Sequence, residues 1–241
     1  MDFEVDAHCH SIASGHSYST IMEIARAASE KGLKMIGITD HGPAMPGGPP
    51  ENYFPNLKVV PEELFGVEIL RGVEGNIIDS RGNLDLPIKI LETLDLILAG
   101  LHEVCLQPGT CKDNTLAMIK AIENPFIDII VHPGNPVFPI DVEVILEAAK
   151  TNNTLIEINN SSLGVSRLGS EENCMRIADL CKKLGVPVAV GSDSHIATSV
   201  GEFGKVVEIF NRIDMPEDLV MNLSSKKFKD FLKSKGKKRF K

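Results

Sequence analysis

The stretch Asp6-Ala7-His8-Cys9-His10, followed six residues later by His16, decides how this chain is interpreted. It comes at the end of the first apolar run, residues 3–7. Alternate side chains of a β-strand share a face, so His8 and His10 should project together from Cα atoms roughly 7 Å apart, with Cys9 on the opposite side. Two imidazoles placed in this way can hold one metal ion. The short motif alone is equally compatible with two ordinary histidines.

The remaining histidines occupy the same kind of position as this pair. Each lies at or just beyond the end of an apolar, β-branched run, and one further run of this type ends in a glutamate. The positions that follow His16 are His41, Glu74, His102, His132, and Asp193 with His195. From His8, the steps to His41, Glu74, His102, His132 and Asp193 are 33, 33, 28, 30 and 61 residues. One strand and one helix need roughly 30 residues, so each step is one βα unit and the last is two.

Metal-binding side chains at the C-terminal ends of successive strands are how an α/β barrel builds its site. A chance placement of all seven histidines at strand ends is improbable. The sequence therefore predicts an α/β barrel with seven parallel strands and a metal centre at its C-terminal face.

Length and composition set the wider limits. The 241 residues suit a single large α/β domain covering residues 1–241, and no tract is biased enough to be disordered. The first residues are acidic where a secretory signal would be basic, and no apolar run approaches the length of a membrane span, so no membrane partner is expected. Five cysteines, an odd number without a C-x-x-C pair, predict inert thiols in a reducing, cytoplasmic compartment.

Charge is spread unevenly along the chain. The net charge is −8, yet residues 226–241 carry nine Lys or Arg against one acid, which leaves −16 for the rest. Such a body would repel a nucleic-acid backbone except where metal ions or the tail offset its charge, so nucleic acid is not the expected partner. The basic tail could bind an anionic partner. The i, i+3, i+4 spacing of Phe228, Phe231 and Leu232 favours instead a solvated helix end that docks by one face.

Hydrophobic periodicity predicts the elements of the barrel. The expected strands are residues 3–7, 34–39, 68–73, 94–99, 127–131, 154–158 and 186–190. The expected helices are residues 19–31, 87–92, 114–122, 141–150 and 170–184, with further helices after residue 203. Ser170 is the expected N-cap of its helix, and residues 75–84 should form a hairpin.

Residues 42–55 hold five prolines and three glycines. This composition predicts an irregular loop, longer than a typical βα connection, of the kind that forms active-site lids. A rigid surface loop without a role is the alternative.

Nine side chains are the predicted metal ligands: His8, His10, His16, His41, Glu74, His102, His132, Asp193 and His195. Zinc takes three protein ligands in an open catalytic site and four in a closed one, so nine ligands suit two or three ions, with Glu74 able to bridge a pair. Seven imidazoles favour zinc first, with manganese, iron or cobalt as feasible substitutes. Clustered dications would turn a shared water into a metal-bound hydroxide and neutralise a phosphoryl group. No protein nucleophile is expected, because the sequence has no G-x-S-x-G motif.

The motifs D-x-H-x-H, T-D-H and G-S-D-S-H, together with E-I-N-N-S-S, resemble those of the polymerase-and-histidinol-phosphatase (PHP) family, and most closely its YcdX-like phosphatase branch. The resemblance covers essentially the whole barrel, and no ligand position departs from the pattern. It implies a distorted (β/α)₇ TIM-like barrel, three zinc ions, a small phosphorylated substrate and a homo-oligomer, with a trimer suggested.

The same resemblance implies a grouping of the ligands that spacing does not give. His8, His10, Glu74 and Asp193 would hold one ion. Glu74, His102 and His132 would hold the second, and His16, His41 and His195 the third.

Four further residues are weaker candidates. Arg167 could grip a substrate phosphate with two N–H groups, and Arg81 in the predicted hairpin turn is its rival, although a surface arginine is the ordinary interpretation of both. Asp6 and Asp40 could orient ligand histidines, and ordinary strand-end hydrogen bonds are the alternative.

The function predicted from these features is a metal-dependent phosphatase. A PHP-type phosphodiesterase or nuclease is the main alternative, but the acidic body and the scarcity of aromatic residues for base stacking argue against it. An amidohydrolase-like enzyme also begins with H-x-H, but as a family it usually adds a strand-four lysine, where this chain has His102. The last alternative is a metal-bound scaffold or regulatory protein without catalytic activity. Such a protein would need a site whose mouth is blocked.

Overall fold

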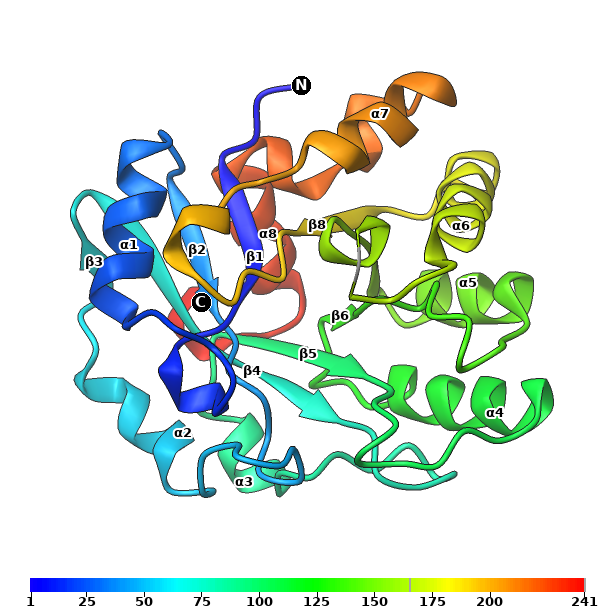
Figure 1. Cartoon of the computed structure of the whole chain (residues 1–241), viewed down its shortest axis with the longest axis horizontal. Coiled ribbons are helices and arrows are strands. Elements are labelled where there is room, and N and C mark those ends of the chain that lie inside the picture. Colours follow the sequence, from blue (N-terminus) through cyan, green and yellow to red (C-terminus); the bar gives the residue numbers. More distant parts are fainter. Residues whose placement is uncertain (165, 241) are drawn as a thin grey trace.

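The computed structural model, which describes residues 1–164 and 166–240, is a nearly closed barrel of seven parallel strands surrounded by helices (Figure 1). The strands follow the order β1-β2-β4-β5-β6-β7-β8, so each strand lies beside the next one along the chain. The barrel strands are β1 Val5–Cys9, β2 Met35–Ile38, β4 Val67–Asn76, β5 Leu96–Gly100, β6 Ile129–Ile130, β7 Leu155–Asn159 and β8 Val188–Gly191. The short β3, Glu63–Leu64, pairs antiparallel with β4. The predicted fold class and the number of barrel strands are confirmed.

The last strand meets the first mainly through side chains and a single bridge. Cys9 and Ser194 form a parallel bridge at the C-terminal ends of β1 and β8. Lower in the barrel the buried amide of Asn222 fills the gap: its Nδ2 donates to Val5 O and Val190 O, and its Oδ1 accepts from Val190 N. A side chain from near the C-terminus therefore replaces part of the missing strand pairing.

Helices cover the outside of the barrel, with α4, α5 and α6 side by side along one flank (Figure 1). The helices are α1 Ile21–Glu30, α2 Tyr53–Asn56, α3 Ile88–Leu91, α4 Cys111–Ile122, α5 Val142–Thr151, α6 Ser170–Leu184, α7 Gly204–Arg212 and α8 Ser225–Ser234. None of the described helices is long and apolar enough to cross a bilayer.

Two expectations about helix starts were wrong. Helix α4 begins at Cys111, three residues earlier than predicted, because Thr110 and Asp113 form a reciprocal capping box there. Ser170 is not an N-cap: Gly169 takes that place with φ 88°, and the buried Ser170 hydroxyl has no hydrogen-bond partner among the residues that the structure describes.

The barrel interior has an apolar lower layer and a polar upper layer. Val5, Met35, Leu70, Leu96 and Leu155 contribute to the lower one. In β1, Asp6 pairs with Ile36 and Cys9 with Ile38, so a bulge gives β1 one extra residue between these pairs. Because of it, Ala7 and His8 both lie in the interior, whereas Cys9 belongs to the outer core beneath the helices. The predicted orientation of Cys9, away from His8 and His10, is confirmed.

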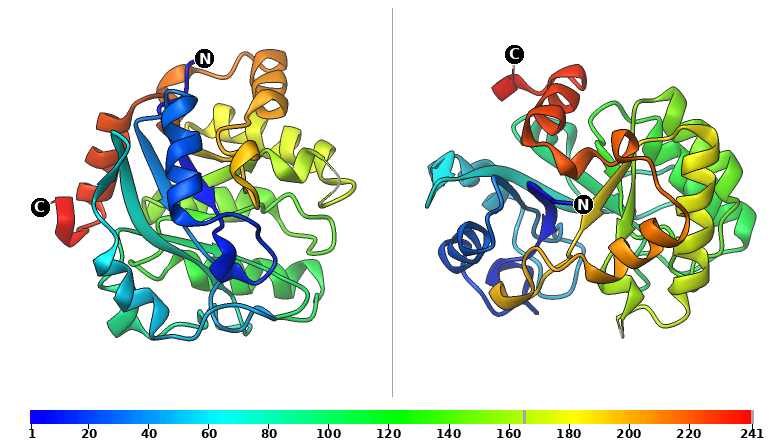
Figure 2. Two further views of the ribbon diagram at one scale, coloured as in Figure 1. Left: turned by 60° about the vertical axis from the view of Figure 1, so that its left-hand side comes forward. Right: turned by 90° about the horizontal axis from the view of Figure 1, so that it is seen from above.

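The C-terminal segment forms the floor of the barrel. Phe228, Phe231 and Leu232 of α8 pack into the apolar lower layer, as the predicted one-face docking requires. Beyond α8 the chain continues along the barrel (Figure 2, red), where the buried Lys237 Nζ lies 2.6 Å from Asp128 Oδ2. Arg239 Nη1 lies 3.0 Å from Asp95 Oδ2. Part of the basic tail is thus used in ion pairs inside the molecule.

The loop of residues 42–55 is tied to the barrel rim at several points. Tyr53 OH donates to Asp40 Oδ2 at 2.6 Å, and Ala44 N donates to Asp85 Oδ2 at 2.8 Å. The chain also comes so close to itself at Gly15 that a Cβ there would lie 2.3 Å from the Gly47 carbonyl oxygen. Because these contacts hold the loop against the barrel, it forms a wall of the site and is not a free lid.

Candidate metal centre

All nine predicted ligands converge at the C-terminal end of the barrel. His10, His41, His102, His132, Asp193 and His195 follow the ends of β1, β2, β5, β6 and β8, His16 lies in the loop after β1, and His8 lies inside β1. Glu74 differs from the prediction, because β4 continues to Asn76 and keeps pairing with β5 as far as Gly100. Its carboxylate therefore projects from within the strand into the barrel interior.

The fully buried carboxylate of Glu74 is at the middle of the cluster. Its Oε1 lies 2.7 Å from His132 Nε2 and 3.1 Å from His102 Nε2. Its Oε2 lies 2.7 Å from His41 Nδ1 and 3.4 Å from the Nε2 atoms of His8 and His10. One oxygen thus faces two imidazoles and the other faces three, which is the arrangement a carboxylate needs to bridge two cations.

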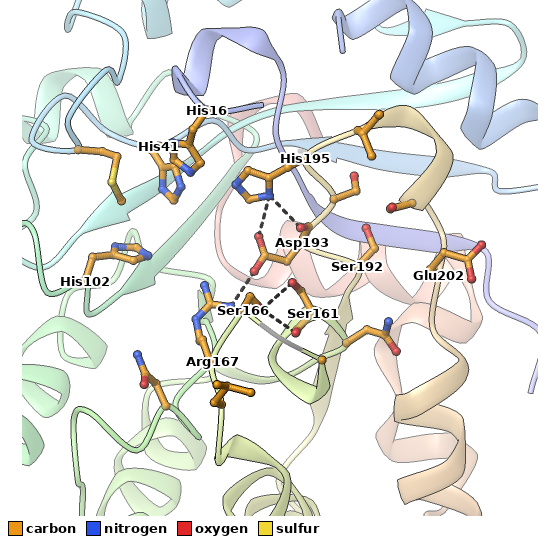
Figure 3. A pocket seen from close by; sticks show the side chains of 18 of the residues that line it. His16, His41, His102, Ser161, Ser166, Arg167, Ser192, Asp193, His195 and Glu202 are labelled. Carbon is orange, nitrogen blue, oxygen red and sulfur yellow. Dashed lines mark hydrogen bonds and ion pairs between the residues drawn. The ribbon is translucent and has the colours of Figure 1, made fainter. Parts of the chain in front are cut away.

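Asp193 supplies the second carboxylate. Its Oδ1 lies 3.3 Å from His10 Nε2, 3.7 Å from His8 Nε2 and 3.6 Å from His195 Nδ1. Its Oδ2 accepts a hydrogen bond from Arg167 Nη1 at 2.9 Å (Figure 3).

His16 completes the set at the outer side. Its ring stacks between those of His41 and His195, with centroid distances of 5.0 and 4.9 Å. Figure 3 shows these three rings together at the top of the pocket, with His102 below His41.

Four nitrogen and oxygen atoms of the cluster are buried and make no hydrogen bond of good geometry to any described residue: His41 Nδ1, Glu74 Oε2, His102 Nδ1 and His102 Nε2. This holds even though His41 Nδ1 and Glu74 Oε2 lie 2.7 Å apart. Leaving one such group unsatisfied costs about 1–3 kcal/mol, so a cluster of them is expected to have a ligand in the functional protein. Mixed imidazole and carboxylate donors are those that zinc and related transition metals prefer. The residues present therefore fit a multinuclear transition-metal site.

Hydrogen-bond counting shows which nitrogen of two ligands is free. Ser14 Oγ gives its only hydrogen to Asp40 Oδ1 at 2.7 Å, so it must accept from His10 Nδ1 at 3.0 Å. His195 Nδ1 donates to the carbonyl oxygen of Asp193 at 3.0 Å. In the neutral form of each ring, Nε2 is then the nitrogen without a hydrogen and is the one available to a metal ion.

The charges within the cluster are strongly coupled. Burial raises the pKa of Glu74, but the neighbouring His41, His102 and His8 together lower it by more. The pKa of this carboxyl therefore lies well below the usual range. Burial likewise raises the pKa of Asp193, and His8 and Arg167 bring it well below the usual range. Both carboxyls are therefore ionised and ready to bind cations.

The imidazoles respond to burial in different ways. Burial, followed by Arg167, lowers the pKa of His132 to about 3. Burial also opposes protonation of His8, but Glu157, Glu74 and Asp193 together raise its pKa well above the usual value. His132 is neutral over the whole physiological range, whereas a proton competes with a metal ion at His8.

Of the two acids expected to orient histidines, only Asp40 acts toward a ligand side chain, and it does so through Ser14. Asp6 accepts from the backbone N–H groups of Ser192 and Gly201, the ordinary strand-end bonding that was the alternative. An acid that directly contacts the imidazole of a predicted ligand was not predicted: Glu157 Oε1 lies 2.8 Å from His8 Nδ1. A charged residue inside the apolar strand Leu155–Asn159 is the signal that could have identified it.

A pocket of about 960 Å³ opens beside the cluster. Five of the predicted ligands line it, together with Arg167, Lys205 and Glu202 and apolar side chains that include Val104, Leu168 and Ile196. Met45 is the contribution of loop 42–55 to this wall. Arg81 is instead exposed and paired with Asp79 in the turn of the predicted hairpin, away from the pocket lining. The site mouth is open, which removes the blocked-scaffold alternative.

A barrel of parallel strands with clustered imidazole and carboxylate side chains at its C-terminal face is an architecture typical of metal-dependent hydrolases. The PHP domain model matches residues 6–239, and the chain belongs to this family. The chain is 51% identical to a probable phosphatase of Clostridium novyi, over 98% of this chain and 97% of that protein. It is 55% identical to a probable phosphatase of Caldanaerobacter subterraneus subsp. tengcongensis, over 97% and 92%.

Among solved structures, the fold resembles the histidinol phosphate phosphatase of Lactococcus lactis in complex with zinc, L-histidinol and phosphate. The TM-score is 0.63 at 19% identity, covering 88% of this chain and 94% of that one. The predicted family and the predicted enzyme class, a phosphoesterase, are confirmed by these relatives, and the amidohydrolase alternative is dropped.

Proposed function

We propose that residues 1–241 form one PHP domain that hydrolyses a small phosphomonoester by means of three bound zinc ions. The observation that carries this proposal is the Glu74 carboxylate, whose two oxygens face five imidazoles. It lies in a buried cluster in which several nitrogen and oxygen atoms lack a good hydrogen bond to the described residues. When bound, the ions would supply an activated water as nucleophile and neutralise charge on the phosphoryl group. Manganese, iron or cobalt could replace zinc at such donors.

The ligand grouping expected from the family agrees with most of the observed distances. Glu74 Oε2 and Asp193 Oδ1 flank His8 and His10, and Glu74 Oε1 faces His102 and His132. Two residues depart from this grouping. His41 Nδ1 lies 2.7 Å from Glu74 Oε2 and could join Glu74 and His102. The nitrogens of His10, His41 and His195 also lie within 4.8 Å of one another, so His10 could join the outer pair. Anomalous scattering at the zinc edge would decide which ion His41 binds.

Arg167 is the residue we propose for substrate phosphate. It is held by Asp193 Oδ2 and by Ser162 Oγ through the same Nη1, at 2.9 and 3.2 Å. The guanidinium lines the pocket beside the ligands, and its remaining N–H groups suit two phosphoryl oxygens. The pocket is large enough for a leaving group as well, and its exposed apolar side chains, such as Leu168 and Val104, would contact that group.

The test is release of inorganic phosphate from a panel of phosphorylated metabolites by zinc- and manganese-loaded protein. Turnover in water enriched in heavy oxygen should place one label on the released phosphate in a single turnover. Label in the protein, or a trapped phospho-enzyme, would show that a side chain attacks first. Selective cleavage of phosphodiesters in the same panel would favour the nuclease alternative. A homotrimer stays a prediction, which sedimentation would check.

A further inference from the structure

One buried carboxylate of the barrel interior, that of Glu157, lies outside the proposed ligand set. Glu157 is in the middle of β7, 3% exposed, and pairs with Ala189 of β8. Both of its oxygens are occupied by hydrogen-bond donors, which keeps them from serving as metal ligands themselves. The donors are His8 Nδ1, His132 N and Asn159 Nδ2. The first two belong to proposed ligands, and the third also donates to the proposed ligand Asp193.

The first contact fixes the imidazole of His8. Glu157 Oε1 lies 2.8 Å from His8 Nδ1, and an ionised carboxylate can only accept. His8 Nδ1 therefore carries the hydrogen, and Nε2, which faces Glu74 and Asp193 at 3.4 and 3.7 Å, is the nitrogen offered to a metal ion. A carboxylate in this position also makes the imidazole a stronger ligand.

The other oxygen supports two ligands whose backbone is in the left-handed region. Glu157 Oε2 accepts from the backbone N–H of His132 at 2.8 Å, where φ is +35°. It also accepts from Asn159 Nδ2 at 3.0 Å, and the same amide reaches Asp193 Oδ2 at 3.3 Å, where φ is +53°. Such conformations are strained for residues other than glycine and persist only where the surroundings hold them.

Gly191 makes room for this arrangement. A Cβ at Gly191 would lie 2.2 Å from Glu157 Oε1 and 2.6 Å from the Cβ of His8. Glycine is needed here because a side chain would not fit between Glu157 and His8. Its backbone angle is not the reason, since its φ is not positive.

We propose that Glu157 is a positioning residue of the metal centre, which sets the tautomer of His8 and ties His8, His132 and Asp193 to one another. The inference rests on the proposed metal centre and adds a determinant of metal affinity that is neither a ligand nor in contact with the pocket.

The decisive variant is Glu157→Gln, which keeps the shape and replaces one acceptor by a donor. If the amide oxygen serves His132 and Asn159, the amide NH₂ faces His8 Nδ1 and favours the tautomer that carries its hydrogen on Nε2. That hydrogen blocks the metal-binding nitrogen. Asp128→Asn is the matched control, because Asp128 is an equally buried carboxylate that accepts from Ile97 N and pairs with Lys237, remote from the ligands.

Zinc affinity is measured by competition with a chromophoric chelator, without substrate. Glu157→Gln should bind at least one zinc ion about 10–100-fold more weakly than the unmodified protein. Asp128→Asn should melt at a lower temperature yet bind zinc as tightly as the unmodified protein. Wild-type affinity and full zinc content in Glu157→Gln would overturn the inference, as would an equal loss of affinity in Asp128→Asn.

Should Glu157→Gln fail to fold, the unmodified protein still decides the matter. Nitrogen-15 spectra of the zinc-loaded protein should show His8 protonated at Nδ1 and metal-bound at Nε2, and the reverse assignment would overturn the inference. Failure of the unmodified protein to take up zinc would instead refute the proposed metal centre itself.

Discussion

Replacing Glu74 with alanine should remove about one of three metal ions. In the expected grouping, Glu74 serves two ions, so its loss leaves the ion at His102 and His132 with two protein ligands. Catalytic zinc sites ordinarily have three, so this ion should be lost first. The ion at His8 and His10 would keep Asp193 and stay bound more weakly.

Elemental analysis of the purified, zinc-reloaded variant should therefore give about two ions per chain instead of about three. Phosphate release should fall by at least about 100-fold, because a change among groups that orient the metal already costs 10–100-fold. The matched control is Glu103→Ala, which removes an exposed glutamate from the wall of the same pocket and should leave the metal content unchanged. Circular dichroism would establish that both variants are folded. A Glu74→Ala protein with three ions and full turnover would refute the bridging role.

Three other outcomes follow from the structure. Stabilisation by zinc, measured as the rise in melting temperature on loading, should grow as the pH increases. Because the pKa of His8 is raised in the folded protein, protonated His8 stabilises the metal-free fold at low pH, and this contribution is lost as the pH rises through that pKa. Zinc binding gains over the same range because His8 becomes a deprotonated ligand. An equal rise at all pH values would contradict this assignment. Lys237→Met, which leaves the buried Asp128 unpaired, should cost about 3–5 kcal/mol in urea unfolding, whereas Lys238→Met, at an exposed pair, should cost less than about 1 kcal/mol. Similar losses in the two variants would argue against a buried ion pair. Cys9→Ser should leave turnover per bound metal unchanged, since Cys9 faces the outer core, and a large loss would implicate the thiol.

The fold and the ligand set could be predicted because both follow a simple period. A buried parallel strand is a nearly continuous apolar run, and the change to His41, His102 or His132 at its end is conspicuous in the sequence. Glu74 could be found in the same way, although its strand continues two residues beyond it. Sequence alone says that these side chains meet at one face of a barrel.

The supporting residues could not be predicted in this way, because their partners lie far away in the chain. Glu157 and His8 are 149 residues apart, and nothing near Glu157 indicates which ligand it contacts. The bulge in β1 is a feature of the pairing with β2, so alternation could not show that Ala7 and His8 share the interior. The role of Ser14 depends on counting the hydrogens of one hydroxyl between His10 and Asp40.

The amide of Asn222, which fills the gap between the first and last strands, has a consequence for biosynthesis. His8 and His10 are made more than 200 residues before Asn222, but their barrel cannot close until Asn222 has left the ribosome. At a translation rate of roughly 5–20 residues per second, the interval between them is about 10–40 s. During that time these predicted ligands are on a chain that lacks its floor and, until β8 has been made, its last strand. The barrel mouth that gathers the predicted ligands is therefore completed only after residue 222 has been made.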